Sequence, residues 1–337
     1  MRCCKRLLLT IVLGQAAVAL GQSFQLPTPN QAIFESGKEA EYFTPTIGRT
    51  WPSGTFGCVR SEGWQMHEGI DIKCTRRDPK GEPIDPVSAA ADGTIAYINA
   101  LPGLSNYGNY IVMQHEIDNL TVYSLYAHLR EIASGLSVGQ AKKTGEFIAT
   151  MGRTSNISQG ISRERAHLHF EICLLANPNF SDWYKKKLPG QRNDHGRWNG
   201  QNLIGIDPWK LFLSQQEARA RRQAFTLQEF IRNQPVLCRV LVRSPSLQWA
   251  KRHPGLADPP SSPKTIAGYE VSLDSNGVPV RCVPRDAGAF SDNEPIKLLN
   301  VDTEVHKQAP CRKLVFKKGQ QWVITAKGLE HLKLLAH

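Results

Sequence analysis

The feature that most constrains this chain is a short alternating run, His167 to Ile172. Successive side chains of an extended strand point to opposite faces, so the run separates into an apolar face and a polar face. We expect the apolar face to meet a core, and the polar side chains His167, His169 and Glu171 to meet solvent. Two histidines two positions apart lie about 6 to 7 Å apart at their backbones, so both can reach one small site. One can bind a metal ion while the other acts beside it.

A second motif, His67 followed by Asp71, offers the other half of such a site. A straight strand would hold these residues about 13 Å apart, too far to share one ion, so the segment must bend. Gly69 permits a bend at little steric cost, and this glycine and the turn-rich segment 73–76 disfavour a helix. Two imidazoles and one carboxylate are a ligand set of catalytic zinc, whereas calcium needs more oxygen ligands. The residue types therefore indicate zinc.

Three motifs in order carry a resemblance: His67-Glu68-Gly69-Ile70-Asp71, Tyr126-Ala127-His128-Leu129 and His167-Leu168-His169-Phe170-Glu171. They are similar to the three signatures of the lysostaphin and LytM type zinc endopeptidases. The resemblance extends from about Trp51 to Asp207 and includes a strand-like run, Gly108 to Val112. It implies one zinc ion held by His67, Asp71 and His169, with His128 and His167 as the two catalytic histidines.

The chain departs from the family pattern at two places. The family enters its last motif through a short turn rich in glycine and threonine, whereas this chain has the longer segment 155–165, which ends in Arg163-Glu164-Arg165. The family also reaches an Asp-Pro pair soon after that motif, but here the insertion 177–205 comes before Asp207-Pro208. We expect the insertion to form a wall of the substrate cleft.

The N-terminal residues have the pattern of a secretory signal. Basic residues precede an apolar run from Leu7 to Leu20, and Ala19-Leu20-Gly21 resembles a cleavage site. We therefore expect residues 1–21 to be a signal peptide and the protein to be exported, either to the periplasm or out of the cell. The run is too short for a confident membrane span, and no other stretch approaches about 20 apolar residues. An integral membrane segment is not expected after signal removal.

Six cysteines remain after residue 21, an even number that an exported chain can pair in disulfides. Fifteen pairings are possible, so the sequence does not determine the connectivity. Cys58 with Cys74 would stiffen the loop around His67, and Cys282 with Cys311 would be a C-terminal pair. Buried free thiols are the alternative.

A chain of 337 residues favours two domains. We expect an extended lead-in at 22–50, a mainly β catalytic domain at 51–206, a helical linker at 207–235 and a smaller β-rich domain at 236–337. The catalytic domain is expected to be an antiparallel β-sandwich or open barrel. The C-terminal region is either a wall-binding module or a plain structural domain. The expected strands are 94–99, 109–115, 121–127, 146–151 and 167–173, then 237–242, 269–273, 278–282 and 315–323, with a terminal helix at 329–335.

Two further features have simple explanations. His115, beside Glu116 and Asp118, is expected to be a surface histidine. The basic cluster of Arg219, Arg221 and Arg222 is expected to be a solvated helix face.

The formal charge is +11, and loss of three basic residues with the signal lowers it to +8. This surplus favours acidic partners. Export argues against nucleic acid and favours anionic wall polymers, although much of the charge can be ordinary solvated surface.

The resemblance implies hydrolysis of peptide bonds in peptidoglycan, in stem peptides or cross-links. The chain has no His-Glu-x-x-His motif, so no glutamate base is implied, and His128 and His167 are left to act on the water, the oxyanion and the leaving amine. Glu171 is a candidate for orienting a ligand or an ordinary solvated glutamate. One alternative is a non-catalytic scaffold that binds the wall and activates another hydrolase, although such relatives usually lose zinc ligands. A peptidase acting on proteins is another.

Overall fold

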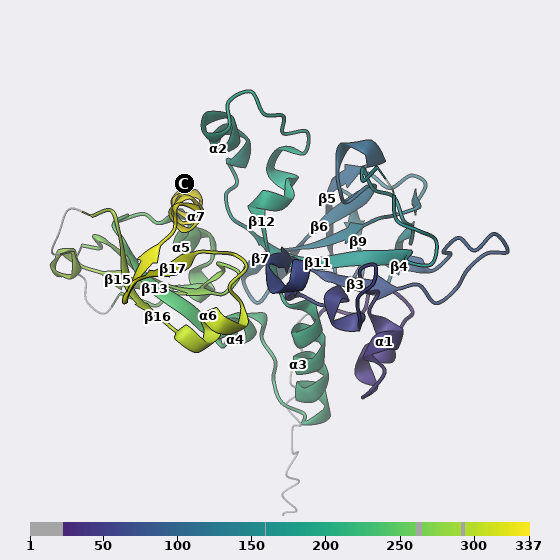
Figure 1. Ribbon diagram of the computed structural model, residues 1–337, viewed down its shortest axis with the longest axis horizontal. Coiled ribbons are helices and arrows are strands. Elements are labelled where there is room, and N and C mark those ends of the chain that lie inside the picture. The colour runs from purple at the N-terminus through teal and green to yellow at the C-terminus, as the bar shows by residue number, and fades with distance from the viewer. Residues whose placement is uncertain (1–22, 159, 261–264, 291–293) are drawn as a thin grey trace, which may run out of the picture.

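The computed structural model describes residues 23–158, 160–260, 265–290 and 294–337 (Figure 1). The expected signal peptide, residues 1–21, lies outside these ranges. Among the described residues, no helix is both long and apolar enough to cross a membrane.

The N-terminal half contains an open, antiparallel seven-stranded sheet, drawn in blue to teal in Figure 1. Its strand order is β12-β11-β7-β6-β5-β9, and β3 also pairs with β11. The expected mainly β fold with antiparallel sheets is confirmed, and the sheet does not close into a barrel. The strands of the sheet are β3 Ile70–Lys73, β5 Gly93–Asn99, β6 Tyr110–Ile117, β7 Leu120–Ala127, β9 Ala141–Lys142, β11 His167–Leu175 and β12 Leu203–Ile206.

Smaller sheets flank this one. A three-stranded sheet has the order β4-β10-β8, and β1 pairs with β2 in a hairpin that leads into the first histidine motif. All five strands expected in this half are present, with ends that differ by one or two residues. The strands of the small sheets are β1 Gly57–Arg60, β2 Gln65–His67, β4 Pro86–Ser88, β8 Glu131–Ile132 and β10 Phe147–Thr150.

The central strand β11 is buried along its whole length. Its apolar side chains, including Phe170, belong to the main core, as predicted. The polar face differs from the prediction, because His167, His169 and Glu171 are only 3%, 6% and 0% exposed. His167 and His169 line a cleft and do not face open solvent, because neighbouring loops and the N-terminal lead-in also line it. Glu171 is fully buried.

The lead-in packs on the sheet and is not extended throughout. It contains η1 Ala32–Phe34 and α1 Glu39–Tyr42, and Phe43 forms a β-bridge with Ile72 of β3. The Phe43 ring stacks on Trp51 at 5.9 Å. Phe43 is fully buried and Trp51 partly buried, and Thr46 and Ile47, which follow Phe43, line the cleft.

The expected helical linker is two helices and not one. α3 spans Pro208–Ala220 and begins at Asp207, whose carboxylate accepts hydrogen bonds from the first backbone amides. α4 spans Leu227–Arg232. The chain turns between them, where Arg222 has a φ of 55°, a conformation that cannot continue a helix. The basic cluster is exposed, as predicted, but it is not one helix face, because Arg219 lies on α3 and Arg221 and Arg222 follow its end.

The insertion 177–205 is not a wall of the cleft, and that prediction was wrong. It forms α2 Phe180–Lys187 and two short turns, η5 Gly196–Trp198 and η6 Gly200–Asn202. Trp198 packs on Tyr97 and Tyr123, with ring centroids 6.5 and 5.3 Å apart, so the insertion covers aromatic side chains of the sheet.

The C-terminal half, green to yellow in Figure 1, holds a second antiparallel sheet with the order β15-β14-β13-β16 and a separate hairpin, β17–β18. The expected strand 315–323 is this hairpin, and the terminal helix is α7. The elements are β13 Val236–Val242, α5 Gln248–Arg252, η7 Pro254–Leu256, β14 Gly268–Asp274, β15 Pro279–Arg285, η8 Ala287–Ala289, β16 Ile296–Val301, α6 Thr303–Gln308, β17 Val315–Lys318, β18 Gln321–Ile324 and α7 Ala326–Ala336.

The cysteine pairs suggested by the sequence are both wrong. Among the residues that the structure describes there is one disulfide, Cys58–Cys311, across a separation of 253 residues. It joins the β1–β2 hairpin to the C-terminal half, because tertiary packing brings these distant segments together. Free, buried thiols are found at Cys74, Cys173, Cys238 and Cys282.

His115 is also corrected. It is 1% exposed, lies 2.7 Å from the Ser124 hydroxyl and lies 2.9 Å from the Asp92 carbonyl. Burial lowers its pKa to about 4. It is a neutral core residue and not a surface histidine.

Candidate metal centre

Three neighbouring segments bring together His67, Asp71 and His169. His67 ends β2, Asp71 lies in β3, and His169 stands directly opposite Asp71 in the pairing of β3 with β11. Gly69 lies where the chain passes from β2 to β3, and a Cβ there would come within 2.3 Å of the Phe170 carbonyl oxygen. Only glycine fits this close approach, so the expected bend between His67 and Asp71 is confirmed.

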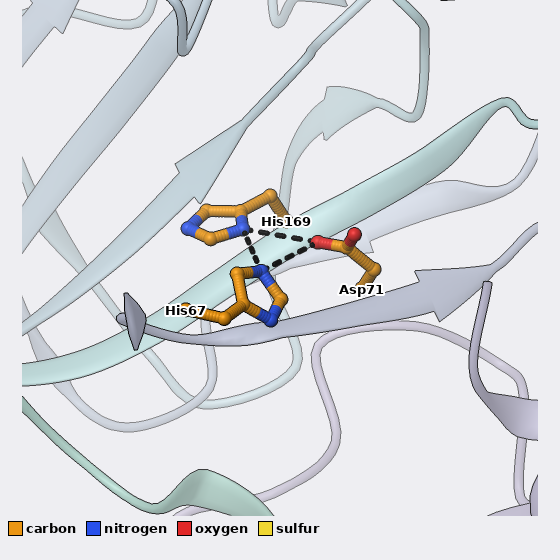
Figure 2. Close-up of side chains that lie close together, drawn as sticks. All are labelled: His67, Asp71 and His169. Atoms are coloured by element: carbon orange, nitrogen blue, oxygen red, sulfur yellow. Dashed lines mark hydrogen bonds and ion pairs between the residues drawn. The ribbon is translucent and has the colours of Figure 1, made fainter. Parts of the chain in front are cut away.

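The three side chains present one donor atom each to a common point (Figure 2). His67 Nε2 lies 3.1 Å from His169 Nδ1 and 3.1 Å from Asp71 Oδ1, and His169 Nδ1 lies 3.0 Å from Asp71 Oδ1. Tetrahedral zinc with bonds of about 2.0 to 2.1 Å separates its ligands by about 3.3 Å. The donor types and their spacing therefore fit a zinc ion with little movement.

Hydrogen bonds determine which nitrogen of each imidazole can bind a metal. His67 Nδ1 donates to the Thr55 carbonyl at 2.7 Å, which leaves Nε2 as the donor atom for the metal. On His169 the assignment is reversed, because Nε2 donates to Glu171 Oε1 at 2.9 Å and leaves Nδ1. The Tyr107 hydroxyl donates to the same Glu171 oxygen at 2.6 Å. Glu171 thus holds His169 in one orientation, as carboxylates commonly do beside metal-binding histidines.

Charge at the cluster favours a cation. Burial acts to raise the pKa of Asp71, but the nearby His167 and His67 and hydrogen bonding hold it well below its usual range. Burial acts to lower the pKa of His169, but its hydrogen bonds to Asp71 and Glu171 outweigh this and raise it to about 9. Without metal, a proton on His169 partly offsets the two carboxylates.

Arg60 is a member of the site that sequence reasoning missed. It ends β1, and its Nη2 donates to Asp71 Oδ2 at 2.5 Å and lies 3.0 Å from His67 Nε2. The first contact leaves Asp71 Oδ1 available for metal, whereas the second uses the lone pair that a metal would use. No sequence motif marks this arginine, because its place depends on the pairing of β1 with β2.

His128 and His167 lie beside the cluster, with ring centroids 4.8 Å apart. Nδ1 of His128 donates to the Thr154 carbonyl at 2.8 Å, and Nδ1 of His167 donates to the Arg165 carbonyl at 2.5 Å. Each therefore keeps Nε2 as a proton acceptor. Burial and the neighbouring histidines hold the pKa of His128 well below its usual range, and burial lowers that of His167. Both are neutral at neutral pH.

The backbone at His128 is unusual, with a φ of 60° immediately after β7. This left-handed conformation is uncommon for a residue other than glycine and occurs often at functional sites. It turns the chain sharply, so that the side chain leaves the sheet and enters the cleft.

The five sequence-predicted residues all line one cleft of about 540 Å³. Arg60, Tyr107 and Arg165 line it as well. Two strongly exposed apolar side chains also line it, Ile47 at 76% and Ile157 at 52% exposure. The site is open enough for a polymer segment and has both apolar and basic surfaces.

Comparison with known proteins gives the family. The model of peptidase family M23 matches residues 65–179. Lipoprotein NlpD of Yersinia enterocolitica is 36% identical over 96 residues, which cover 28% of this chain and 84% of that protein. The residues that the family model matches include all three members of the His-Asp-His cluster. The chain belongs to peptidase family M23.

Two further relatives are matched only in part, and this chain covers half of their length or less. The uncharacterized lipoprotein YgeR of Escherichia coli K12 is 34% identical over 153 residues, which cover 44% of this chain and 50% of YgeR. The murein hydrolase activator NlpD of the same strain is 38% identical over 135 residues, which cover 38% of this chain and 29% of NlpD.

Solved structures include the catalytic domain of lysostaphin from Staphylococcus simulans, at 24% identity and a TM-score of 0.25, covering 39% of this chain and 74% of that one. A zinc-containing peptidase from Vibrio cholerae has 26% identity and a TM-score of 0.24, covering 40% of this chain and 30% of that one.

Proposed function

We propose that this protein is a zinc-dependent endopeptidase that hydrolyses peptide bonds in peptidoglycan, in stem peptides or cross-links. The observation that carries the proposal is the convergence of three metal-binding donor atoms within 3.1 Å of one another beside two neutral histidines. In this proposal the catalytic unit is residues 51–206, and the protein works in the cell envelope after export.

His67, Asp71 and His169 would hold the zinc ion, which would supply a Lewis acid able to lower the pKa of water to about 7 and to polarise a carbonyl group. His128 and His167 present Nε2 acceptors to the same space, so either can take the proton of the attacking water and pass it to the leaving amine. Between these two transfers the imidazole is protonated and stabilises the negative charge that develops on the carbonyl oxygen.

Two other groups hold this arrangement in place. Glu171 orients His169 and is itself held by Tyr107. Arg60 holds the second oxygen of Asp71, so that Oδ1 points to the metal position. These residues act on the ligands and not on the substrate.

The first test pairs zinc content with digestion of purified sacculi. The wild type should contain nearly one zinc per chain and release new muropeptides, and His169→Ala should lose both. His337→Ala, which changes an exposed histidine outside the cleft, is the matched control and should retain both. A folded wild type without zinc would contradict the proposal, and zinc with cleavage of casein but not sacculi would redirect it to protein substrates.

A second candidate function is activation of a separate wall hydrolase, as the name of the NlpD relatives states for those proteins. The observation that favours it is the identity to NlpD over 135 residues. If the protein is an activator, its His169→Ala variant should still stimulate a purified wall hydrolase. The two functions are therefore separated by adding such a hydrolase to both variants and comparing the products.

A further inference from the structure

Among the described residues, Arg165 forms no ion pair with a carboxylate, whereas the nearby Arg153 and Arg163 do. It lines the cleft and is half-buried, and its Nε donates to the Pro45 carbonyl at 3.0 Å. Within the described part of the chain, no carboxylate lies within ion-pair distance of its guanidinium. In contrast, the more exposed Arg163, two residues earlier, pairs with Glu82 at 2.9 Å, and Arg153 pairs with the same carboxylate.

The acidic side chains that line the cleft, Asp71 and Glu68, already have charged partners. Asp71 accepts hydrogen bonds from Arg60 and His169 and is a metal ligand in the proposed function. Glu68 faces Arg312 at 3.7 Å, and burial raises its pKa, with a further contribution from Glu171. No acidic side chain in this cleft is therefore left to neutralise Arg165.

Burial makes the uncompensated charge significant. Desolvation lowers the pKa of Arg165, as does the positive charge of Arg60, although Asp71 acts in the opposite direction. A half-buried cation without a counter-ion is unfavourable, and an anion that enters the cleft relieves this. The apolar side chains of Ile47 and Ile157 line the same cleft and reduce the screening of such a contact by water.

Arg165 lies close to His167, one of the two histidines that act on the peptide bond in the proposed function. His167 Nδ1 donates to the Arg165 carbonyl at 2.5 Å, so the two residues are held together in the chain. Arg165 lies in the turn that leads into β11, and residues two positions apart are at most about 7 Å apart at their backbones. Both side chains line the same cleft. An anion held by Arg165 therefore lies within one or two peptide residues of a carbonyl group beside His167.

We propose that Arg165 binds a free carboxylate of the peptide substrate next to the bond that is cut. The proposal rests on the proposed peptidase function and names a recognition element of that site. The planar guanidinium of arginine matches a carboxylate with two parallel hydrogen bonds, and Nη1 and Nη2 remain for this because Nε is used by Pro45. The carboxylate comes either from the C-terminus of a stem peptide or from an acidic residue within it.

The test compares cross-linked muropeptides with the same molecules after their carboxylates have been converted to amides. Wild type should cleave the native substrate with a kcat/KM about 10- to 100-fold higher than the amidated one, mostly through KM, because a charge-assisted contact is lost. Arg165→Gln should remove most of this preference and bring the native substrate down to the amidated rate. Arg163→Gln, the matched control on the exposed neighbour, should retain the preference.

A binding measurement separates this inference from the peptidase proposal. Zinc-depleted wild type should bind native muropeptide more tightly than the amidated form, and Arg165→Gln should lose the difference. If this difference in binding is found but no substrate is cleaved, the peptidase proposal is refuted and the carboxylate site is supported. Cleavage with equal kcat/KM for native and amidated substrate would overturn the carboxylate site, as would an equal loss on both substrates in Arg165→Gln. The wild-type comparison needs no variant, so the test remains decisive if Arg165→Gln fails to fold.

Two synthetic stem peptides, each with one amide, identify the source of the carboxylate. If amidation of the C-terminus removes the preference, Arg165 binds the C-terminal carboxylate of the stem peptide. If amidation of the acidic residue removes it, Arg165 binds the side-chain carboxylate of that residue. Arg165→Lys keeps the positive charge but loses the planar guanidinium, and it should retain part of the preference for the native substrate in either case.

Discussion

Strands β11 and β14 each bury a glutamate in an antiparallel sheet, but the two glutamates meet opposite surroundings. Glu270 on β14 is flanked by Arg239 and Arg285 from the two neighbouring strands, with its oxygens 3.3 and 3.1 Å from their nitrogens. Glu171 on β11 meets the imidazole of His169 and the neutral hydroxyl of Tyr107. The C-terminal sheet thus neutralises its glutamate with two arginines, whereas the N-terminal sheet offers Glu171 a titratable histidine and a neutral hydroxyl.

The two halves also differ in how they use buried histidine. His128 keeps one ring nitrogen bonded to a backbone carbonyl and turns the other toward the cleft. His253, in the C-terminal half, packs on Trp249 at 4.4 Å, and neither of its ring nitrogens has a hydrogen-bond partner. Burial lowers the pKa of both, to about 3 for His253. Low basicity alone therefore does not mark a catalytic histidine, and access to the cleft distinguishes the two.

The largest effect on activity should come from substituting the buried histidine of each half, His128 and His253. His128→Ala should lower kcat on muropeptides by about 10²- to 10⁴-fold while zinc content is unchanged, because it removes a proton acceptor and no ligand. His253→Ala should lower the melting temperature and leave kcat of the folded protein close to wild type. Zinc lost in His128→Ala, or kcat lost in folded His253→Ala, would contradict the assignment.

A smaller effect should come from the two glutamates. Glu171→Gln should weaken zinc binding by about 10- to 100-fold, because the amide no longer holds His169 as a charged acceptor. Glu270→Gln leaves two arginines without a carboxylate and should lower stability without a change in zinc affinity. Competition with a chelator measures the first and thermal unfolding the second. Equal zinc affinity in both variants would show that Glu171 does not position the ligand.

The smallest effect should be the pH dependence of zinc binding. Zinc must displace the proton that His169 holds in the metal-free protein, where its pKa is about 9. Apparent zinc affinity should therefore rise about tenfold per pH unit from about pH 7 and level off near pH 9. For the metal-free protein the sign is opposite. A raised folded-state pKa contributes stability that is complete below the unfolded value of about 6.5 and is lost as pH rises through about 9.

Calorimetric titration in buffers of different protonation enthalpy measures the proton released on zinc binding. Release of about one proton at pH 7.5 is expected from His169. No release at that pH would show that His169 is already neutral and would remove the contrast between the metal-free and zinc-bound proteins.

The sequence by itself predicted the strands and the bend at Gly69, which are local features. The resemblance of three ordered motifs predicted five site residues, which the structure brings into one cleft. Alternation along β11 follows from the two-residue repeat of a strand, and the Gly69 bend follows from a glycine between two residues that must share one ion. The ordered motifs then identified which histidines belong together. These features need no knowledge of how distant segments pack.

Tertiary structure alone decided the rest. Tyr107 reaches Glu171 across 64 residues, and Cys58 bonds Cys311 across 253, and neither pairing has a local pattern. Arg60 joins the site through the register of a hairpin, and the burial of His115 depends on its contacts with Asp92 and Ser124. The physical reason is the same in each case. Local backbone geometry is encoded by neighbouring residues, whereas long-range partners are selected only when the whole chain packs.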